Sequence, residues 1–272
     1  MTLCDDGPIP LYLTFDVDAD EARRFGQPDG PENTNISDLS LGRYGIVRGL
    51  PRILGLLGEL RIPATFFVPG ATVDAHPGAI KQIAGDGHEI GHHGYHHFAP
   101  TTISEAQERE EIDRGIEAIE RCIGVRPLGY RAPAWAPTLT TLRLLCERDF
   151  LYDSSAMGDD RPYLERVGEA TVREVPVHWS LDDFPYFGAA LGYLHPQREP
   201  RTVFDAWQVE IESAIKEHRP TGFCLHPEVI GRALTFTHLE QLLRTLSNDS
   251  RVIFQRCVDV ARSIALDVTA DG

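Results

Sequence analysis

The sequence predicts an α/β fold in which parallel strands form a sheet or a barrel with helices packed outside. Three observations lead to this class: strand-like and helical segments alternate along 272 residues, 42% of the residues are hydrophobic, and polar side chains follow several strand-like runs. Repeated strand–helix units favour parallel pairing, because each helix returns the chain to the same edge of the sheet. We expect one domain over residues 1–272, since a chain of this size buries a core without cross-links.

The first expected strands and helices alternate from the N-terminus onward. Residues 11–15 form a continuous apolar run, which is typical of a buried strand. Apolar side chains at helical spacing predict a helix over residues 46–60. Residues 64–68 predict a second strand, which the Pro-Gly pair at 69–70 ends. A helix over residues 77–86 follows, with a proline in its first turn.

A short third strand, expected over residues 88–91, is followed by the longest predicted helix, residues 104–123. Ser104 and Gln107 have the spacing of a capping box, in which each side chain bonds the backbone N–H of the other residue. The acidic run at residues 108–111 is expected to be a solvated face of this helix.

Shorter segments of the same two kinds complete the second half of the chain. The expected strands are residues 129–131, 151–154, 173–177, 222–225 and 252–254, and the expected helices are residues 139–148, 202–217, 237–247 and a last helix from about residue 258. Two long stretches, residues 19–44 and 180–200, are expected to be irregular. Loops of this length in a compact domain usually serve function or an interface.

The charge balance excludes several classes of partner. The chain has 26 Lys and Arg against 41 Asp and Glu, a formal net charge of −15, so we expect no nucleic-acid or anionic-membrane partner. No stretch approaches the roughly 20 apolar residues of a membrane span. The N-terminus has no signal-peptide pattern, so we expect a cytoplasmic protein. Five widely spaced cysteines indicate free thiols rather than a disulfide framework.

Histidines concentrate in one short stretch after the third expected strand. Residues 87–97 read Gly-His-Glu-Ile-Gly-His-His-Gly-Tyr-His-His and hold five of the chain's eleven histidines. Two imidazoles four residues apart can bind the same ion, and two pairs have this spacing: His92 with His96, and His93 with His97.

Two carboxylates, Asp16 and Asp18, follow the first expected strand. In α/β barrels the side chains that follow the strands meet at one face, where the active site lies. A set of one carboxylate and two histidines, such as Asp18, His93 and His97, leaves positions on a divalent ion open for water and substrate. The sequence therefore predicts a hydrolytic metal site at the carboxyl ends of the strands.

Five short motifs follow one another along the chain: residues 14–18 (Thr-Phe-Asp-Val-Asp), 87–97, 130–135 (Tyr-Arg-Ala-Pro-Ala-Trp), 179–186 (Trp-Ser-Leu-Asp-Asp-Phe-Pro-Tyr) and 223–227 (Phe-Cys-Leu-His-Pro). In this order they resemble the motifs of the polysaccharide deacetylases of the NodB-homology type, also called carbohydrate esterase family four. The resemblance covers nearly the whole chain and implies a distorted (β/α)7-type barrel. The Asp-Val-Asp and His-Pro forms resemble a branch that contains peptidoglycan-deacetylase-like and allantoinase-like proteins.

The resemblance implies how the metal site and the general base are built. Asp18, His93 and His97 would hold a divalent metal, for which we expect zinc, with cobalt or another divalent ion as alternatives. Asp16 would be the general base that takes a proton from the attacking water. Arg131 would pair with Asp16 and keep it ionised.

The remaining roles that the resemblance implies concern the acid and the substrate. His226 would be the general acid that protonates the departing amine. Trp135, Asp183 and Tyr186 would contact the substrate, and either Asp182 or Asp183 would orient a histidine or Arg131. The other pair of histidines with this spacing, His92 and His96, would be structural, because the lead-in of the family's motif selects His93 and His97 as ligands.

We expect a metal-dependent hydrolase that removes an N-acetyl group from an amino-sugar glycan such as peptidoglycan or chitin. A first alternative is an allantoinase-like hydrolase of small cyclic amides, which the lack of a visible export signal favours. A second alternative is an inactive glycan-binding protein, against which the full set of site residues argues. The resemblance also implies a homo-oligomer.

Overall fold

The computed structural model describes residues 7–25, 30–168, 170–190, 193–194 and 198–264. Its centre is a curled sheet of seven parallel strands. From the second strand onward, the order of the strands across the sheet follows their order along the chain. These strands are β10 (Thr221–Leu225), β1 (Ile9–Asp16), β2 (Thr65–Val68), β3 (Glu89–His92), β4 (Gly129–Tyr130), β5 (Tyr152–Asp153) and β7 (Ala170–Glu174). The expected distorted barrel of seven parallel strands is thus confirmed.

The barrel is incomplete where its two edges approach. On one side β6 (Tyr163–Val167) pairs antiparallel with β7 and ends the sheet. On the other side β10 is the edge strand, and one isolated bridge joins Cys224 of β10 to Asp182. A further strand, β11 (Val252–Gln255), pairs with the first half of β1, while β2 pairs with its second half.

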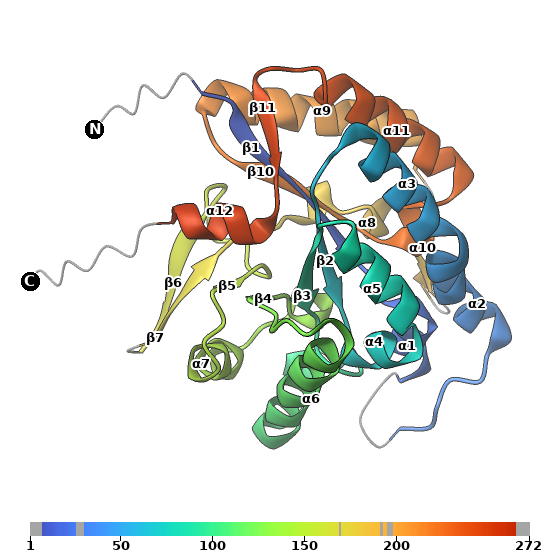
Figure 1. Cartoon of the computed structure of the whole chain (residues 1–272), viewed down its shortest axis with the longest axis vertical. Helices are drawn as coiled ribbons and strands as arrows, with labels where there is room; N and C mark the ends of the chain where they lie inside the picture. The colour runs from blue at the N-terminus through green and yellow to red at the C-terminus, as the bar shows by residue number, and fades with distance from the viewer. Residues whose placement is uncertain (1–6, 26–29, 169, 191–192, 195–197, 265–272) are drawn as a thin grey trace, which may run out of the picture.

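Helices cover the outside of the curled sheet (Figure 1). They are α3 (Leu50–Leu60), α4 (Gly70–Ala75), α5 (Pro77–Gly85), α6 (Glu105–Ile123), α7 (Leu139–Glu147), α9 (Pro200–Glu217), α10 (Pro227–Ile230), α11 (Ala233–Leu246) and α12 (Cys257–Ser263). The buried side chains of α3 show why they pack there: Leu50, Ile53, Leu54 and Leu57 recur at helical spacing on one face. The capping box of Ser104 and Gln107 at the start of α6 is confirmed.

The two stretches expected to be irregular contain short helices, so that expectation was wrong in part. Residues 19–44 hold α1 (Ala19–Arg24) and α2 (Ile36–Tyr44), which leads through a π-helical turn, Gly45–Gly49, into α3. Residues 180–200 include α8 (Phe184–Phe187) and the two-residue strands β8 (Ala189–Ala190) and β9 (Tyr193–Leu194). Neither α1 nor α2 carries a continuous apolar stripe, which is why periodicity did not predict them.

Helices α1 and α2 nevertheless pack closely beside the strand end at Asp16. A Cβ at Gly42 of α2 would lie 2.1 Å from the carbonyl oxygen of Ala19, so only glycine permits this approach. Ala19 itself has a positive φ of 58° immediately after Asp18. The contact therefore fixes the chain direction just past the predicted metal ligand.

Two other sequence-based expectations concern the described residues. Within those residues, no helix is both long and apolar enough to cross a membrane. Cys122, Cys146, Cys224 and Cys257 are free thiols, as expected, while Cys4 lies outside the described residues.

Candidate active site

A cavity of about 240 Å³ opens where the carboxyl ends of β1, β3, β4 and β10 meet. This is the face at which side chains from successive parallel strands converge. The cavity is lined by Asp16, Asp18, His93, His97, Ala134, Trp135, Trp179, Asp182, Phe184 and His226. Residues that are as many as 210 positions apart in the sequence thus line the same hollow.

Three of the lining residues form a candidate metal site. Asp18, His93 and His97 offer ligand atoms that all lie within 4.8 Å of one another. Asp18 Oδ1 lies 3.7 Å from His93 Nε2 and 3.5 Å from His97 Nε2. That oxygen is buried and accepts no hydrogen bond from the described residues. A buried carboxylate oxygen that lacks a donor but faces two imidazole nitrogens suits a divalent cation, and this donor set is one that zinc accepts.

His93 is held with Nε2 toward the site and in its neutral form. Its Nδ1 lies 2.7 Å from the backbone carbonyl oxygen of Arg131, so Nδ1 carries the proton and donates it. Burial lowers the pKa of His93 to about 4, although the nearby Asp16 acts to raise it. The free electron pair on Nε2 is therefore available to a cation at neutral pH.

The loop that carries His97 is anchored by Glu111 of α6. Its Oε2 accepts hydrogen bonds from the backbone N–H groups of Tyr95 at 3.0 Å and His96 at 2.7 Å, and its Oε1 lies 2.6 Å from His96 Nδ1. The expectation that residues 108–111 form a solvated face was wrong for two of them, because Glu108 and Glu111 are buried. Both lie one helical turn before buried residues of α6, and this spacing could have revealed them.

The other pair of histidines points away from the cavity. His92 Nε2 lies 3.0 Å from the carbonyl oxygen of Ile112 in α6, and His92 Nδ1 accepts a hydrogen bond from the backbone of Gly94. Gly94 has a positive φ of 71°, which glycine adopts without strain. His92 and His96 thus brace the loop, and His93 and His97 face the cavity.

Asp16 and Arg131 form a buried ion pair beside the candidate metal site. Arg131 Nη1 lies 2.7 Å from Asp16 Oδ1 and also donates to Thr14 Oγ1 at 2.8 Å. Both side chains are almost fully buried. Burial alone would raise the pKa of Asp16, but the charges of Arg131 and then His93 lower it to about 2. Asp16 is therefore an ionised carboxylate at neutral pH.

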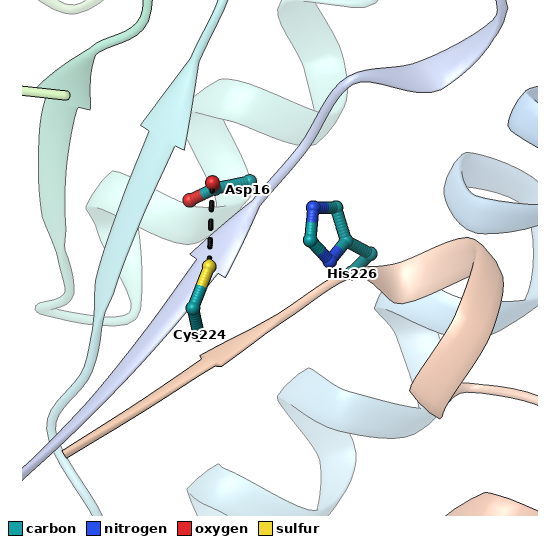
Figure 2. A group of neighbouring side chains, drawn as sticks. All are labelled: Asp16, Cys224 and His226. Atoms are coloured by element: carbon teal, nitrogen blue, oxygen red, sulfur yellow. Dashed lines mark hydrogen bonds between the residues drawn. The ribbon is translucent and has the colours of Figure 1, made fainter. Parts of the chain in front are cut away.

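The second oxygen of Asp16 faces Cys224 and the cavity (Figure 2). The Cys224 thiol donates to Asp16 Oδ2 at 3.4 Å, and Arg131 Nη1 lies 3.3 Å from the same sulfur. Burial raises the pKa of Cys224 well above its ordinary value, so the thiol keeps its proton. Thiols are weak donors, which leaves Asp16 Oδ2 able to accept a proton from elsewhere.

His226 lies beside Asp16, with polar atoms of the two side chains within 4.8 Å of each other, and is held by Asp183. Asp183 Oδ1 lies 2.8 Å from His226 Nδ1, and both oxygens of Asp183 also accept from the backbone N–H of His226. Burial alone would lower the pKa of His226, but the hydrogen bond and charge of Asp183, with a smaller contribution from Asp182, raise it well above its ordinary value. His226 is thus an imidazolium at neutral pH.

Asp182 and Asp183, which the sequence left undistinguished, have different surroundings. Asp183 lies beneath His226 and is not among the residues that line the cavity. Asp182 lines the cavity, accepts from the backbone N–H of Phe184 at 2.9 Å, and lies 3.5 Å from His226 Nδ1. Burial raises the pKa of Asp182 to about 8, and the charge of His226 opposes that shift.

The remaining cavity wall is aromatic. Trp135 and Trp179 have ring centroids 4.3 Å apart, and Phe184 lines the cavity beside His226. Ala134 and Trp135 have positive φ values of 57° and 48°, a strained conformation that occurs mostly at functional sites. Trp179 and Phe184 were not singled out from the sequence, although both lie in the fourth motif. Tyr186, expected to contact substrate, instead bonds the backbone of Ser180 with its hydroxyl at 3.4 Å and does not line the cavity.

Comparison with known proteins identifies the family of this chain. The polysaccharide deacetylase family model matches residues 6–147, which is just over half of the chain. The chain therefore belongs to the polysaccharide deacetylase family and is a hydrolase of that family. The first three motifs lie within the matched residues, and the last two, with His226, lie beyond them.

Individual relatives extend the similarity over almost the whole chain. The peptidoglycan deacetylase of Helicobacter pylori is 27% identical, over 89% of this chain and 92% of its own length. The crystal structure of a polysaccharide deacetylase from Mycobacterium smegmatis is 33% identical and has a TM-score of 0.87, over 96% of this chain and 92% of that chain. The structure of the Puue allantoinase has a TM-score of 0.82 over 95% of this chain and 91% of that chain, but at 24% identity it shows a shared fold alone.

Proposed function

We propose that this protein is a divalent-metal-dependent deacetylase that hydrolyses the N-acetyl group of an amino sugar in a peptidoglycan-type glycan. One observation carries the proposal: Asp18, His93 and His97 converge around a buried Asp18 oxygen that has no hydrogen-bond donor. Asp18, His93 and His97 would hold the ion, for which zinc is the expected choice. A bound divalent ion would polarise the acetyl carbonyl and make the attacking water more acidic.

Asp16 is suited to the role of general base. Its Oδ2 faces the cavity beside His93, from which it lies 3.7 Å, and Arg131 keeps the carboxylate ionised through Oδ1. An ionised carboxylate aimed at the place where water attacks can accept the proton that the water loses. The pair with Arg131 also fixes the direction of the Oδ2 lone pairs, because the guanidinium is itself bonded to Thr14.

His226 is suited to the opposite role of general acid. Its ring lines the cavity beside Asp16, and Asp183 keeps Nδ1 protonated and turned away from the cavity. The other nitrogen, Nε2, can then donate its proton to the amine nitrogen as the amide bond breaks. Base and acid come from the carboxyl ends of two paired strands, β1 and β10, and lie close together beside the cavity (Figure 2).

The cavity favours a short acyl group rather than a long one. Its volume is about 240 Å³, and Trp135, Trp179 and Phe184 make one wall apolar. An acetyl methyl group can pack against such a wall while its carbonyl faces the polar side. The peptidoglycan deacetylase of Helicobacter pylori, which matches over nearly all of both chains, supports a peptidoglycan-type glycan as the substrate.

The test is acetate release from defined substrates by purified protein supplied with zinc or cobalt. Peptidoglycan fragments and N-acetylated chitooligosaccharides should release acetate. Asp16→Asn should lower the rate of release by about 10²-fold or more, because the base is lost. Asp86→Asn, at an exposed position after α5, is the matched control and should retain full activity. Hydrolysis of allantoin with no acetate release from either glycan would contradict the proposal, as would glycan binding without any product.

A further inference from the structure

Two buried carboxyl groups lie side by side in the barrel, away from the cavity residues. Asp153 of β5 and Glu174 of β7 are direct partners in the parallel ladder that joins these strands. Partners in register point to the same face of a sheet, so the two side chains are neighbours. Both residues have 0% of their surface exposed, and neither has a role in the chemistry described above.

Each carboxyl group uses only one of its two oxygens. Asp153 Oδ1 accepts a hydrogen bond from Ser155 Oγ at 2.8 Å. Glu174 Oε1 accepts from the backbone N–H groups of Ser155 and Ala156, each at 2.9 Å. The other two oxygens, Asp153 Oδ2 and Glu174 Oε2, are buried and accept no hydrogen bond from the described residues.

Two ionised carboxylates in this position would be costly for two reasons. Their like charges would repel at short range in a medium of low dielectric, and each would leave a charged oxygen without a donor. A single proton between Oδ2 and Oε2 removes both costs, because one group becomes a donor to the other. Short acid–carboxylate pairs of this kind titrate as one unit.

We propose that Asp153 and Glu174 share one proton and that the resulting acid–carboxylate hydrogen bond positions Arg131, and through it Asp16, by holding Ser154 and Ser155. The positioning part of this proposal rests on the function proposed for Asp16. The shared proton does not, since it follows from register, burial and the two donorless oxygens.

The connection from the pair to Arg131 runs through two serines. Ser155 Oγ, which donates to Asp153, also accepts from the backbone N–H of Ala132 at 2.8 Å. The carbonyl oxygen of Ser154 accepts from Arg131 Nε at 2.8 Å, and Ser154 Oγ accepts from Arg131 Nη2 at 2.8 Å. The guanidinium that holds Asp16 is therefore clamped by the segment that the carboxyl pair fixes.

The charged and titratable groups around the pair come from three strands, β1, β4 and β6, and from the residue directly after β4. In the described residues they are Arg131 after β4, Tyr12 of β1, Tyr130 of β4 and Tyr163 of β6. Burial raises the pKa of Asp153 to about 6 and that of Glu174 well above its ordinary value, while Arg131 opposes the shift at Asp153. The tyrosines stay neutral at physiological pH, since burial raises the pKa of each of them.

The sign of the pH effect follows from the direction of these shifts. A carboxyl group that binds its proton more tightly in the folded than in the unfolded chain stabilises the fold fully below its unfolded pKa, near 4. That contribution is lost as the pH rises through the folded pKa. Glu174→Gln replaces the acid by an amide, whose N–H₂ donates to Asp153 at every pH and whose carbonyl can still accept from residues 155 and 156.

The first experiment measures urea unfolding of the full chain from about pH 5 to pH 9. The urea midpoint of Glu174→Gln minus the midpoint of wild type should increase as the pH rises, so that rising pH favours the variant. Glu117→Gln, at an exposed position of α6, is the matched control and should differ from wild type by a constant amount. A pH-independent difference for Glu174→Gln would overturn the shared proton. In Asp153→Asn an amide replaces the other carboxyl group of the pair, so its midpoint relative to wild type should also increase as the pH rises.

The second experiment detects the proton directly. The infrared difference spectrum between wild type and Glu174→Gln near neutral pH should contain the C=O stretching band of one protonated carboxyl group. A difference that contains carboxylate bands alone would show that both groups are ionised, as they would be around a bound cation, and would overturn the proposal. Neither this measurement nor the unfolding series requires a substrate, so both remain decisive if the proposed deacetylase activity is wrong.

The third experiment tests positioning. Glu174→Ala should lower kcat by about tenfold or more with little change in KM or in bound metal, because displacing a base costs rate rather than binding. Glu174→Gln should recover most of that loss, since it restores the donor. Equal kcat values for wild type and Glu174→Ala would show that the pair does not position Arg131.

Discussion

Two sites in this barrel bury carboxyl groups deeply, and the pKa values at the two sites shift in opposite directions. Asp16 has a guanidinium nitrogen 2.7 Å away and is ionised, with a pKa lowered to about 2. Asp153 and Glu174 have each other as neighbours, and burial raises the pKa of both. Burial is the largest influence on each of these groups, and it always opposes ionisation. The nearest partner, rather than the depth of burial, therefore decides whether a buried carboxyl group carries charge.

Asp18 is a third case under the same rule. Its Oδ1 is buried, yet the described residues offer it neither a guanidinium nor a hydrogen-bond donor. Two imidazole nitrogens face it instead, at 3.5 and 3.7 Å. Each of these three sites thus has its own partner, which is an arginine for Asp16, a proton for the Asp153–Glu174 pair and, we propose, a metal ion for Asp18.

The largest expected effect comes from removing the cation beside Asp16. Arg131→Met leaves a buried carboxylate unpaired, so we expect a loss of about 3–5 kcal/mol in the free energy of unfolding and a fall in kcat of about 10²-fold or more. Urea unfolding and acetate release measure the two effects. If Arg131→Met were as stable as wild type, the comparison would be wrong, because the ionised Asp16 would then not depend on Arg131.

A second prediction concerns His226, whose ring lines the cavity. Asp183 is the main group that raises the pKa of His226, so Asp183→Asn should lower that pKa. The protonated form of His226, which donates to the amine, is then lost at a lower pH. The alkaline limb of the profile of kcat/KM against pH should therefore move to lower pH. An alkaline limb at the wild-type position in Asp183→Asn would show that His226 is not the acid whose titration limits the reaction.

A third prediction concerns a buried carboxyl group whose hydrogen-bond partners are all neutral. Glu89 of β3 accepts from Thr65 at 2.7 Å, from Tyr152 at 2.9 Å and from the backbone N–H of Val258 at 3.0 Å, which joins α12 to the barrel. Burial raises its pKa. Glu89→Ala should cost about 1–3 kcal/mol of unfolding free energy, because three donors lose their acceptor. Glu89→Gln should cost less, since it keeps one acceptor oxygen, and an equal cost for both variants would contradict this account.

The smallest effect is expected at the serine between the carboxyl pair and the motif that contains Arg131. Ser155→Ala removes the bond to Asp153 and the acceptor for the Ala132 N–H, for a loss of about 1–2 kcal/mol by thermal or urea unfolding. The loss should be smaller in a Glu174→Ala background, where the segment is already displaced. Strict additivity of the two losses would mean that Ser155 and the pair act independently.

Much of the site could be predicted because its residues follow strands. Short strands were expected at the places of β1, β3 and β10, and the polar residues just after them, among them Asp18, His93 and His226, meet at the cavity. The choice of His93 over His92 needed the family's motif, because the two histidine pairs have the same spacing. The structure adds the reason, which is that the His92 ring bonds to α6.

Other parts depend on contacts that spacing does not encode. The pairing of Asp153 with Glu174 requires β5 to lie beside β7 rather than beside β6, which comes first in the chain and was not predicted. Glu111 could have been recognised from its place on the buried face of α6, but a run of charged residues suggested solvent instead. Helices α1 and α2 pack through Gly42 and short side chains, so they lack the apolar stripe on which prediction relies.

We propose that the donorless oxygen of Asp18 marks a metal site, and the metal content of the purified protein is the decisive measurement. Metal-stripped protein should bind close to one zinc ion per chain, measured by titration and elemental analysis, and its melting temperature should rise with zinc. Asp18→Asn should lose tight binding and this rise, whereas Asp16→Asn should keep both. Tight zinc binding that survives in Asp18→Asn, or no binding by wild type to zinc or cobalt, would contradict the account.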